Sequence, residues 1–224
     1  MNRGNVTPAD EFVKALEAHA PRFRIVPAPG VVAGLRAYYE IVMRWNPRLH
    51  LVAPCAPAEF ATRHVLESLF AAPHVAEGAH VVDVGSGAGL PVIPCLVARP
   101  DLRALLVESS RKKAVFLREA LSAVGRGEHA EVLAERFQEV PPPTADVLTC
   151  RALERFTGVI PELLSWSSRV KKLLLFGGRS LGTELEKAGL TFNSVLVPES
   201  ERRFLFVSER RSNMGGQDRQ DLQD

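Results

Sequence analysis

The stretch Val81–Pro91, which reads VVDVGSGAGLP, determines the fold class of this chain. An apolar run leads directly into a short segment that holds three glycines, Gly85, Gly87 and Gly89. Glycines at such a turn let the backbone reverse sharply and approach a ligand with no side chain in the way. Pro91 and Pro94 fall in the first turn of the helix that follows, where backbone N–H groups have no intrahelical partner. The stretch therefore predicts a strand, a ligand-binding loop and a helix, in that order.

The same alternation continues along the chain. The apolar runs that predict strands are His80–Val84, Ala104–Glu108, Ala130–Ala134, Ala145–Thr149 and Lys171–Phe176. Helical segments separate them, as at Ser109–Gly125, and buried strands that alternate with helices indicate a parallel sheet covered on both faces. The runs Ser194–Val197 and Arg203–Val207 have no helix between them, which predicts one antiparallel strand at the end of the sheet.

The first 75 or so residues predict helices only. Thr7 precedes a proline and stands three residues before Asp10, a pattern typical of a helix start. After a break at 27–30, apolar residues recur at helical spacing up to Trp45, and Asn46-Pro47 is expected to end that helix. The stripe of Tyr38, Tyr39 and Trp45 is expected to belong to the core. A third helix is predicted over Glu59–Ala71.

Three parts follow: a helical extension over 1–75, an α/β domain over 76–208, and a polar tail over 209–224 that is expected to be disordered. The chain has 224 residues and a net charge of +2, which does not by itself indicate a nucleic-acid partner. Three dispersed cysteines form no zinc-binding pattern and exclude a complete disulfide framework. With no signal peptide and no apolar run of the roughly 18 residues that span a bilayer, a cytoplasmic protein without a metal is expected.

Two acids accompany the loop. Glu108 ends the second strand about 20 residues past the glycines, the spacing at which a carboxylate binds ribose hydroxyls. Asp83 stands two residues before Gly85, where a carboxylate suits an ammonium or sulfonium group. The glycine spacing is G-x-G-x-G and not the dinucleotide pattern G-x-G-x-x-G, so S-adenosylmethionine is favoured over a nicotinamide dinucleotide. The residues expected around this cofactor are Asp83, Gly85, Ser86, Gly87, Gly89, Glu108 and Ser109.

The sequence also resembles a known family, the bacterial small-subunit rRNA guanine-N7 methyltransferases G, also called glucose-inhibited division protein B. The matching segments are LRAYYEIVMRWNPRLHLVAP, RHVLES, VDVGSGAGLPVIP, RPDLRALLVESSRKKAVFLREAL, CRA and SERRFLFV, in the family's order over roughly residues 35 to 208. The resemblance implies a Rossmann-like class I methyltransferase fold, with a mostly parallel seven-stranded sheet, an antiparallel terminal strand and a helical N-terminal extension. It also implies cofactor contacts at Gly85, Leu90, Phe137, Gln138 and Arg151.

Methyl transfer to N7 of a guanine in 16S rRNA is the activity that the resemblance implies, with the small ribosomal subunit as partner. A monomer is expected because the sequence shows no obvious self-complementary surface helix. Guanine N7 already carries a lone pair, so no catalytic residue in the strict sense is expected, and the enzyme need only align the reacting atoms. Some positions depart from the family: Glu67 and Glu108 replace aspartates, and Phe176 stands where a lysine is common. A same-fold enzyme for another RNA or a small molecule, or a ribosome-binding relative without turnover, therefore stays open.

Basic residues near the cofactor should contact the RNA. The candidates are Arg63, His64, Arg111, Lys112 and Arg151. Each has a plainer alternative, except Arg151, whose place at a strand end beside the predicted loop favours a functional role. Arg63 and Glu67 are four residues apart and are the right distance for an ion pair on one helix. His64 is equally suited to the core, and Arg111-Lys112 to a solvated first helical turn.

Overall fold

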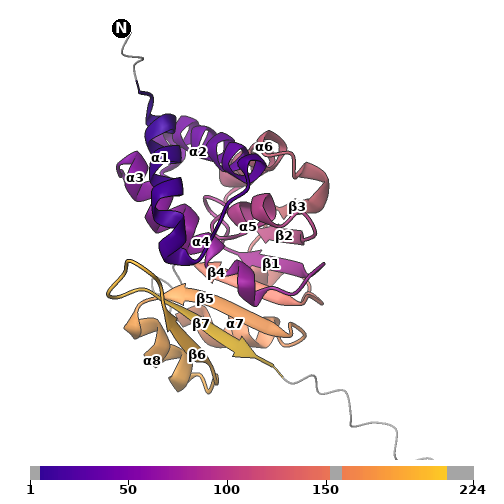
Figure 1. The fold of residues 1–224 in the computed structure, drawn as a ribbon. Helices are drawn as coiled ribbons and strands as arrows, with labels where there is room; N and C mark the ends of the chain where they lie inside the picture. Colours follow the sequence, from indigo (N-terminus) through magenta and orange to yellow (C-terminus); the bar gives the residue numbers. More distant parts are fainter. Residues whose placement is uncertain (1–5, 152–157, 211–224) are drawn as a thin grey trace, which may run out of the picture.

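The computed structural model describes residues 6–151 and 158–210, and a seven-stranded sheet forms its centre (Figure 1). The strands are β1 His80–Val84, β2 Arg103–Val107, β3 Ala130–Leu133, β4 Val147–Arg151, β5 Lys172–Gly177, β6 Asn193–Leu196 and β7 Phe204–Glu209. They lie in the order β3-β2-β1-β4-β5-β7-β6. All seven strands predicted from the apolar runs are present, each displaced by at most two residues at either end.

The first five strands pair in parallel, and β7 is antiparallel to both of its neighbours. The antiparallel strand is the last one in the chain, as expected, but it does not form the edge of the sheet. The connection after Leu196 is short, so β6 and β7 pair with each other as a hairpin. Because β7 also pairs with β5, the half-exposed strand β6 is left at the edge.

The first helix, α1 Pro8–His19, begins at the predicted cap. The Thr7 hydroxyl accepts a hydrogen bond from the Asp10 N–H at 3.2 Å, and the Asp10 carboxylate accepts one from the Thr7 N–H at 3.0 Å. The reciprocal bonds satisfy two donors that have no partner within the helix. The local sequence alone was sufficient to locate this helix start.

The second helix, α2 Pro29–Leu49, is longer than predicted at both ends. Pro29 is its first residue, where a proline loses no helical hydrogen bond, so the predicted break reaches only to Ala28. The prediction that Asn46-Pro47 ends the helix is wrong. Pro47 falls in the last turn, where its missing N–H removes a single hydrogen bond. The helix continues to Leu49, and His50 caps it in a left-handed conformation.

The predicted third helix consists of three consecutive parts. It begins as α3 Pro57–Phe60, continues as a π-helical segment over Ala61–Leu66, and ends as α4 Glu67–Leu69. A π-helical segment pairs residues five apart instead of four, so it interrupts the α-helical hydrogen bonding between α3 and α4.

The sheet separates two layers of helices, and each layer has its own apolar core. The helices before β1 cover one face together with α5 Val92–Ala98 and α6 Arg111–Ala123, and α7 Ile160–Trp166 and α8 Arg179–Lys187 cover the other (Figure 1). On β5, Leu174 faces the first core and Leu173 the second, as the pleat of a strand requires. Tyr38 and Tyr39 lie in the first core, as predicted.

Strand β7 extends to Glu209, and residues 211–224, for which disorder was predicted, lie outside the described residues, as does Ala152 of the CRA motif. Among the helices of 6–151 and 158–210, none is both long and apolar enough to cross a bilayer.

Gly89 is the glycine of the loop with the least room for a side chain. A Cβ there would lie 2.4 Å from the Cδ1 atom of Ile93, and the φ angle of +81° is one that other residues rarely adopt. We expect Gly89→Ala to lower the free energy of unfolding by about 2 kcal/mol, from overpacking and backbone strain together. Urea denaturation followed by circular dichroism measures this.

Gly125→Ala is the matched control for backbone strain. Gly125 has a similar φ of +68°, but a Cβ there meets nothing within 4 Å. Its substitution should cost only about 1 kcal/mol, the strain alone. Equal losses in the two variants would show that the contact with Ile93 is unimportant.

Candidate functional site

The glycine loop between β1 and α5 has the conformation that its sequence predicts. Gly85, Gly87 and Gly89 all have positive φ angles, of 69°, 52° and 81°. Only glycine adopts this region without strain, so each of the three positions requires it. The Ser86 hydroxyl donates to the Asp83 carbonyl at 3.1 Å, which closes the loop onto the end of β1.

Glu108 connects the loop to the next helix. Its carboxylate is buried and accepts one hydrogen bond from the Gly87 N–H and another from the Ser110 N–H, both at 2.8 Å. Ser110 is the N-cap of α6, so the acid joins the glycine loop to the start of that helix. An ionised carboxylate has about four acceptor sites, and Glu108 therefore retains acceptor capacity for a ligand hydroxyl.

Asp83 is almost completely buried beneath the loop. One carboxylate oxygen accepts from the Thr149 hydroxyl on β4 at 2.6 Å, and the other has no partner among the described residues. Burial raises the pKa of Asp83 to about 7, and the nearby charge of Glu108 adds to the shift, while the Thr149 and Ser86 hydroxyls oppose it. A cation brought close to this carboxyl would stabilise its ionised form and lower its pKa.

A cavity of about 290 Å³ lies against this loop, at the carboxyl ends of the parallel strands, and is called the loop cavity here. The predicted residues that line it are Gly85, Ser109, Phe137, Gln138 and Arg151. The other predicted cofactor residues do not line it: these are Asp83, Ser86, Gly87, Gly89, Leu90 and Glu108. They lie in the loop or next to it, and most of them are buried.

Phe137 and Gln138 form one wall of the loop cavity. The Phe137 ring packs edge-on against Trp166, with 5.5 Å between ring centroids, and the Gln138 amide donates to the Glu162 carboxylate at 3.0 Å. Both side chains are thus held in place by α7. A fixed aromatic ring and an amide next to the glycine loop suit the flat, hydrogen-bonding adenine of a nucleoside.

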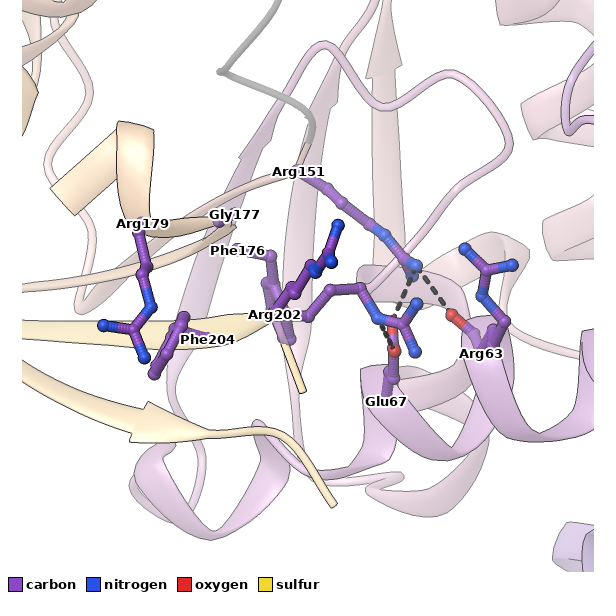
Figure 2. Close-up of a pocket in the computed structure, with 10 residues that line it drawn as sticks. Arg63, Glu67, Arg151, Phe176, Gly177, Arg179, Arg202 and Phe204 are labelled. Carbon is purple, nitrogen blue, oxygen red and sulfur yellow. Dashed lines mark hydrogen bonds and ion pairs between the residues drawn. The ribbon is translucent and has the colours of Figure 1, made fainter. Parts of the chain in front are cut away.

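Arg151, the last residue of β4, lines the loop cavity and also a second, larger cavity. This second cavity has a volume of about 640 Å³ and is called the arginine cavity here. Its arginines are Arg63, Arg151, Arg179, Arg202 and Arg203, and Glu67 is the one acid among the described residues that line it. Figure 2 shows Glu67 next to Arg63 and Arg151, with Arg202 nearby and Arg179 beside the Phe204 ring.

Glu67 lies between two of these arginines. Its side chain is 2% exposed, and its Oε2 accepts from Arg151 Nη2 at 2.9 Å, while Oε1 forms an ion pair with Arg203 (Figure 2). Burial raises the pKa of Glu67 and lowers that of Arg151, although the opposite charges counteract both shifts. Desolvation thus outweighs attraction, and the network positions the guanidinium groups more than it stabilises the fold.

Arg63 does not form the ion pair with Glu67 that its spacing allows. Arg63 pairs with Glu59 one turn earlier, and its backbone carbonyl accepts from Arg151 Nη2 at 2.7 Å. The Glu67 carboxylate is instead taken up by Arg151 and Arg203. The Arg63 side chain remains more than half exposed at the mouth of the arginine cavity.

The other predicted RNA contacts lie outside both cavities. His64 packs against the Phe60 ring, and burial together with the charge of Arg151 lowers its pKa to about 3. Its imidazole is therefore neutral at pH 7 and offers no charge to a phosphate. Arg111 and Lys112 are exposed in the first turn of α6, beside Ser109 but not in either lining.

Sequence reasoning missed four residues of the arginine cavity: Arg179, Arg202, Arg203 and Phe204. Arg179 begins α8 just after β5, at the same carboxyl edge that made Arg151 a candidate. The strand-end rule applied to β5 would have found it. No comparable rule identifies Arg202 and Arg203, because they lie on the hairpin connection before β7.

Two carboxyl groups stand next to residues that line the loop cavity. Asp83 is buried with one oxygen that has no partner among the described residues, Glu108 accepts from the Gly87 N–H, and Phe137 lines the cavity itself. For a metal, the residues of 6–151 and 158–210 contain no group of three or more His, Cys, Asp or Glu side chains that could hold one.

Comparison with known proteins identifies the family of this chain. The model of the family described as rRNA small subunit methyltransferase G matches residues 32–206. A protein named Ribosomal RNA small subunit methyltransferase G from Xanthomonas axonopodis pv. citri (strain 306) is 44% identical over 129 residues, which are 57% of this chain and 60% of that protein. Its namesake from Nitrosomonas eutropha (strain DSM 101675 / C91 / Nm57) is 40% identical over 126 residues, which are 54% and 58% of the two chains. The match thus spans about three fifths of the length of these relatives.

A solved structure gives the fold independently. The SAM dependent methyltransferase from Aquifex aeolicus superposes with a TM-score of 0.56 at 17% identity, and the superposition covers 76% of this chain and 97% of that one. At this identity the likeness concerns the fold alone. Together with the mixed seven-stranded sheet, it confirms the predicted Rossmann-like methyltransferase architecture.

Proposed function

Because the chain belongs to the rRNA small subunit methyltransferase G family, we propose that it transfers a methyl group from S-adenosylmethionine to N7 of a guanine in 16S rRNA. Asp83, Glu108 and the glycine loop hold the cofactor, with Phe137, Gln138 and Arg151 on the walls of its cavity.

The observation that carries the proposal is the shared position of Arg151. It lines both the loop cavity, which suits the methyl donor, and the arginine cavity, which suits an anionic substrate. A methyl donor and its acceptor must come within about 3–3.5 Å of each other in line with the breaking bond. Since both cavities touch Arg151, a donor in one and an acceptor in the other would approach each other at that residue.

The reaction requires the protein to align the reacting atoms, and it requires no general acid or base. S-adenosylmethionine, when bound, supplies an electrophilic methyl carbon on its sulfonium. The lone pair of guanine N7 forms the new N–C bond as the C–S bond breaks, so the positive charge passes from sulfur to the guanine ring. No proton leaves N7, and neither Asp83 nor Glu108 need act as a base. Both carboxylates instead fix the loop and the ligand, through the bonds to Thr149 and Gly87.

Methyl transfer to ribosomal subunits tests the proposal directly. Small subunits that lack their N7 methylation are incubated with the protein and S-adenosylmethionine labelled in its methyl group, and large subunits serve as the control. We expect label in the small subunit alone, mapped to guanine N7 after nuclease digestion. Deproteinised 16S rRNA as a third substrate separates naked RNA from the assembled particle.

The pattern of label distinguishes the alternatives. Cofactor binding without transfer to any ribosomal RNA would contradict the proposal and favour a ribosome-binding relative without turnover. Transfer to a small metabolite, with none to either subunit, would favour a same-fold enzyme of different specificity. Phe176 is the residue that supports this second function, because its buried apolar ring lines the arginine cavity at the position where the family resemblance implies a lysine.

The proposal includes a monomeric protein that acts in the cytoplasm, where small subunits are assembled. The large apolar side chains that the described residues expose are Val6, Val26, Val115 and Leu196. They belong to four separate segments and do not make the continuous apolar patch typical of a stable dimer. Light scattering after size-exclusion chromatography measures the mass, and a value near 49 kDa, twice the 24.5 kDa of one chain, would contradict the monomer.

A further inference from the structure

One wall of the arginine cavity carries an arginine over an aromatic ring. The guanidinium carbon of Arg179 lies 5.7 Å from the centroid of the Phe204 ring (Figure 2). Arg179 is the first residue of α8 and Phe204 the first residue of β7, so two separate elements bring the pair together. Arginine planes and aromatic rings are the side chains on which unstacked bases lie in RNA-binding sites.

Part of the positive charge in the cavity has no acidic partner. Within the described part of the chain, Arg179 and Arg202 form no ion pair with a carboxylate, whereas Arg63, Arg151 and Arg203 each do. Both unpaired arginines are exposed. Five guanidinium groups against one carboxylate among the described lining residues favour an anionic ligand, and Arg179 and Arg202 can reach it without breaking a bond to Glu67.

Apolar side chains lie beneath the Arg179–Phe204 pair. Phe176 is 5% exposed and lines the same cavity, and the Phe204 ring lies 6.0 Å from Phe206 in the core beneath. The Phe204 ring of the pair is therefore supported from below by the core. The volume of about 640 Å³ is in the range of sites that bind molecules of nucleotide size.

We propose that the arginine cavity receives a nucleotide turned out of its base stack, with the base against the Arg179–Phe204 pair and the phosphates on Arg202 and Arg63. The inference rests on the proposed function, in which RNA is the substrate, and adds how the substrate is held. A base inside a duplex has no free face to stack on a side chain. The cavity should accordingly bind a single strand in preference to the same sequence in a duplex.

Binding of short RNA tests the inference. The probe is a fluorescein-labelled single-stranded hexaribonucleotide with one guanine, and the comparison ligand is the same strand annealed to its complement. Fluorescence anisotropy at fixed salt gives the dissociation constant for the full-length protein. We expect Phe204→Leu, which keeps apolar volume but loses the ring face, to weaken single-strand binding by about five- to 100-fold. Phe204→Tyr should restore binding to within about twofold.

Two further variants separate stacking from folding and from charge. Arg179→Ala, at an exposed position where the fold should not suffer, is expected to weaken single-strand binding by about two- to fivefold. Arg103→Ala is the matched control, because it removes an exposed arginine at the amino end of β2, the opposite edge of the sheet. It should leave the dissociation constant unchanged. Affinity for S-adenosylmethionine, measured by calorimetry, should stay constant in all four variants.

The outcomes separate this inference from the function it rests on. If Phe204→Leu binds the single strand as well as the wild type does, or if duplex and single strand bind equally, the inference is overturned even where methyl transfer to subunits is intact. Absence of single-strand binding by the wild-type protein overturns it too. A Phe204 effect that persists in a protein without transferase activity supports the cavity assignment and contradicts only the proposed reaction.

Discussion

Phe60→Ala is expected to lower the free energy of unfolding by about 4 kcal/mol, the largest loss we expect from truncating a single side chain here. The Phe60 side chain is fully buried at the centre of an aromatic cluster. Its ring lies 6.0 Å from Phe12, 6.2 Å from Tyr38 and 5.3 Å from Tyr39. Removal leaves a cavity that these rings, fixed on α1 and α2, cannot fill.

The variant also tests the division of the chain into a helical extension and an α/β domain. The core around Phe60 is continuous with the face of the sheet, since one apolar cluster contains Phe12, Phe60, Val81 and Leu106. We therefore expect residues 1–75 and 76–208 to unfold together, and the variant to shift one transition without creating a second.

Guanidinium denaturation followed by tryptophan fluorescence and by circular dichroism measures both effects. Trp45 lies in the helical extension and Trp166 in the α/β domain, so the probes cover the two parts. Val115→Ala, on an exposed position of α6, is the control and should change stability by less than about 0.5 kcal/mol. Two separate transitions in Phe60→Ala would show that the extension is an independent unit.

Much of the fold is predictable from the sequence because its signals are local. The seven strands follow from apolar runs, and the Thr7 cap and the three loop glycines specify their own geometry. Where prediction failed, tertiary contacts override local preference. Pro47 is accepted inside α2 because it costs one hydrogen bond in a helix that is packed along most of its length. The π-helical turns before Glu67 have no signature in the residues themselves.

The site divides in the same way. The loop cavity was found from one contiguous motif and the acid that follows it, Glu108, because the chain order of a βαβ unit brings them together. The arginine cavity was found only in part, through Arg63 and Arg151. Its other arginines come from α8 and from the connection before β7, and only the pairing of β5 with β7 brings these segments to the same edge.

Asp83→Asn is expected to act in opposite directions on stability and on cofactor binding. In the unfolded chain this carboxyl ionises near pH 3.8, whereas burial holds its pKa at about 7 in the fold. Between these values the folded state binds more protons than the unfolded state, so the stability that the protonated carboxyl contributes is lost as the pH rises through 7. The difference of about 3 pKa units corresponds to a cost on the order of 4 kcal/mol above pH 7.

Asparagine keeps the acceptor for Thr149 but cannot ionise. The variant should therefore be more stable than the wild type at pH 8, by up to about 4 kcal/mol, and nearly equal to it at pH 4. Urea denaturation at the two pH values measures the difference. A wild-type protein with the same stability at both pH values would mean that Asp83 does not carry the raised pKa.

Cofactor binding should respond with the opposite sign. In the proposed function, the ammonium and sulfonium groups of S-adenosylmethionine favour the ionised form of Asp83, which directly precedes Val84 in the lining of the loop cavity. Wild-type affinity should rise with pH up to 7, by at most about tenfold per unit, while Asp83→Asn should bind about tenfold more weakly at pH 8 and lose this dependence. If Asp83 only supported the fold, its substitution would not raise the stability of the protein and at the same time lower its affinity for S-adenosylmethionine. If calorimetry at pH 6 and pH 8 finds equal affinities in the wild type, Asp83 is a buried structural acid and the cation is held elsewhere in the cavity.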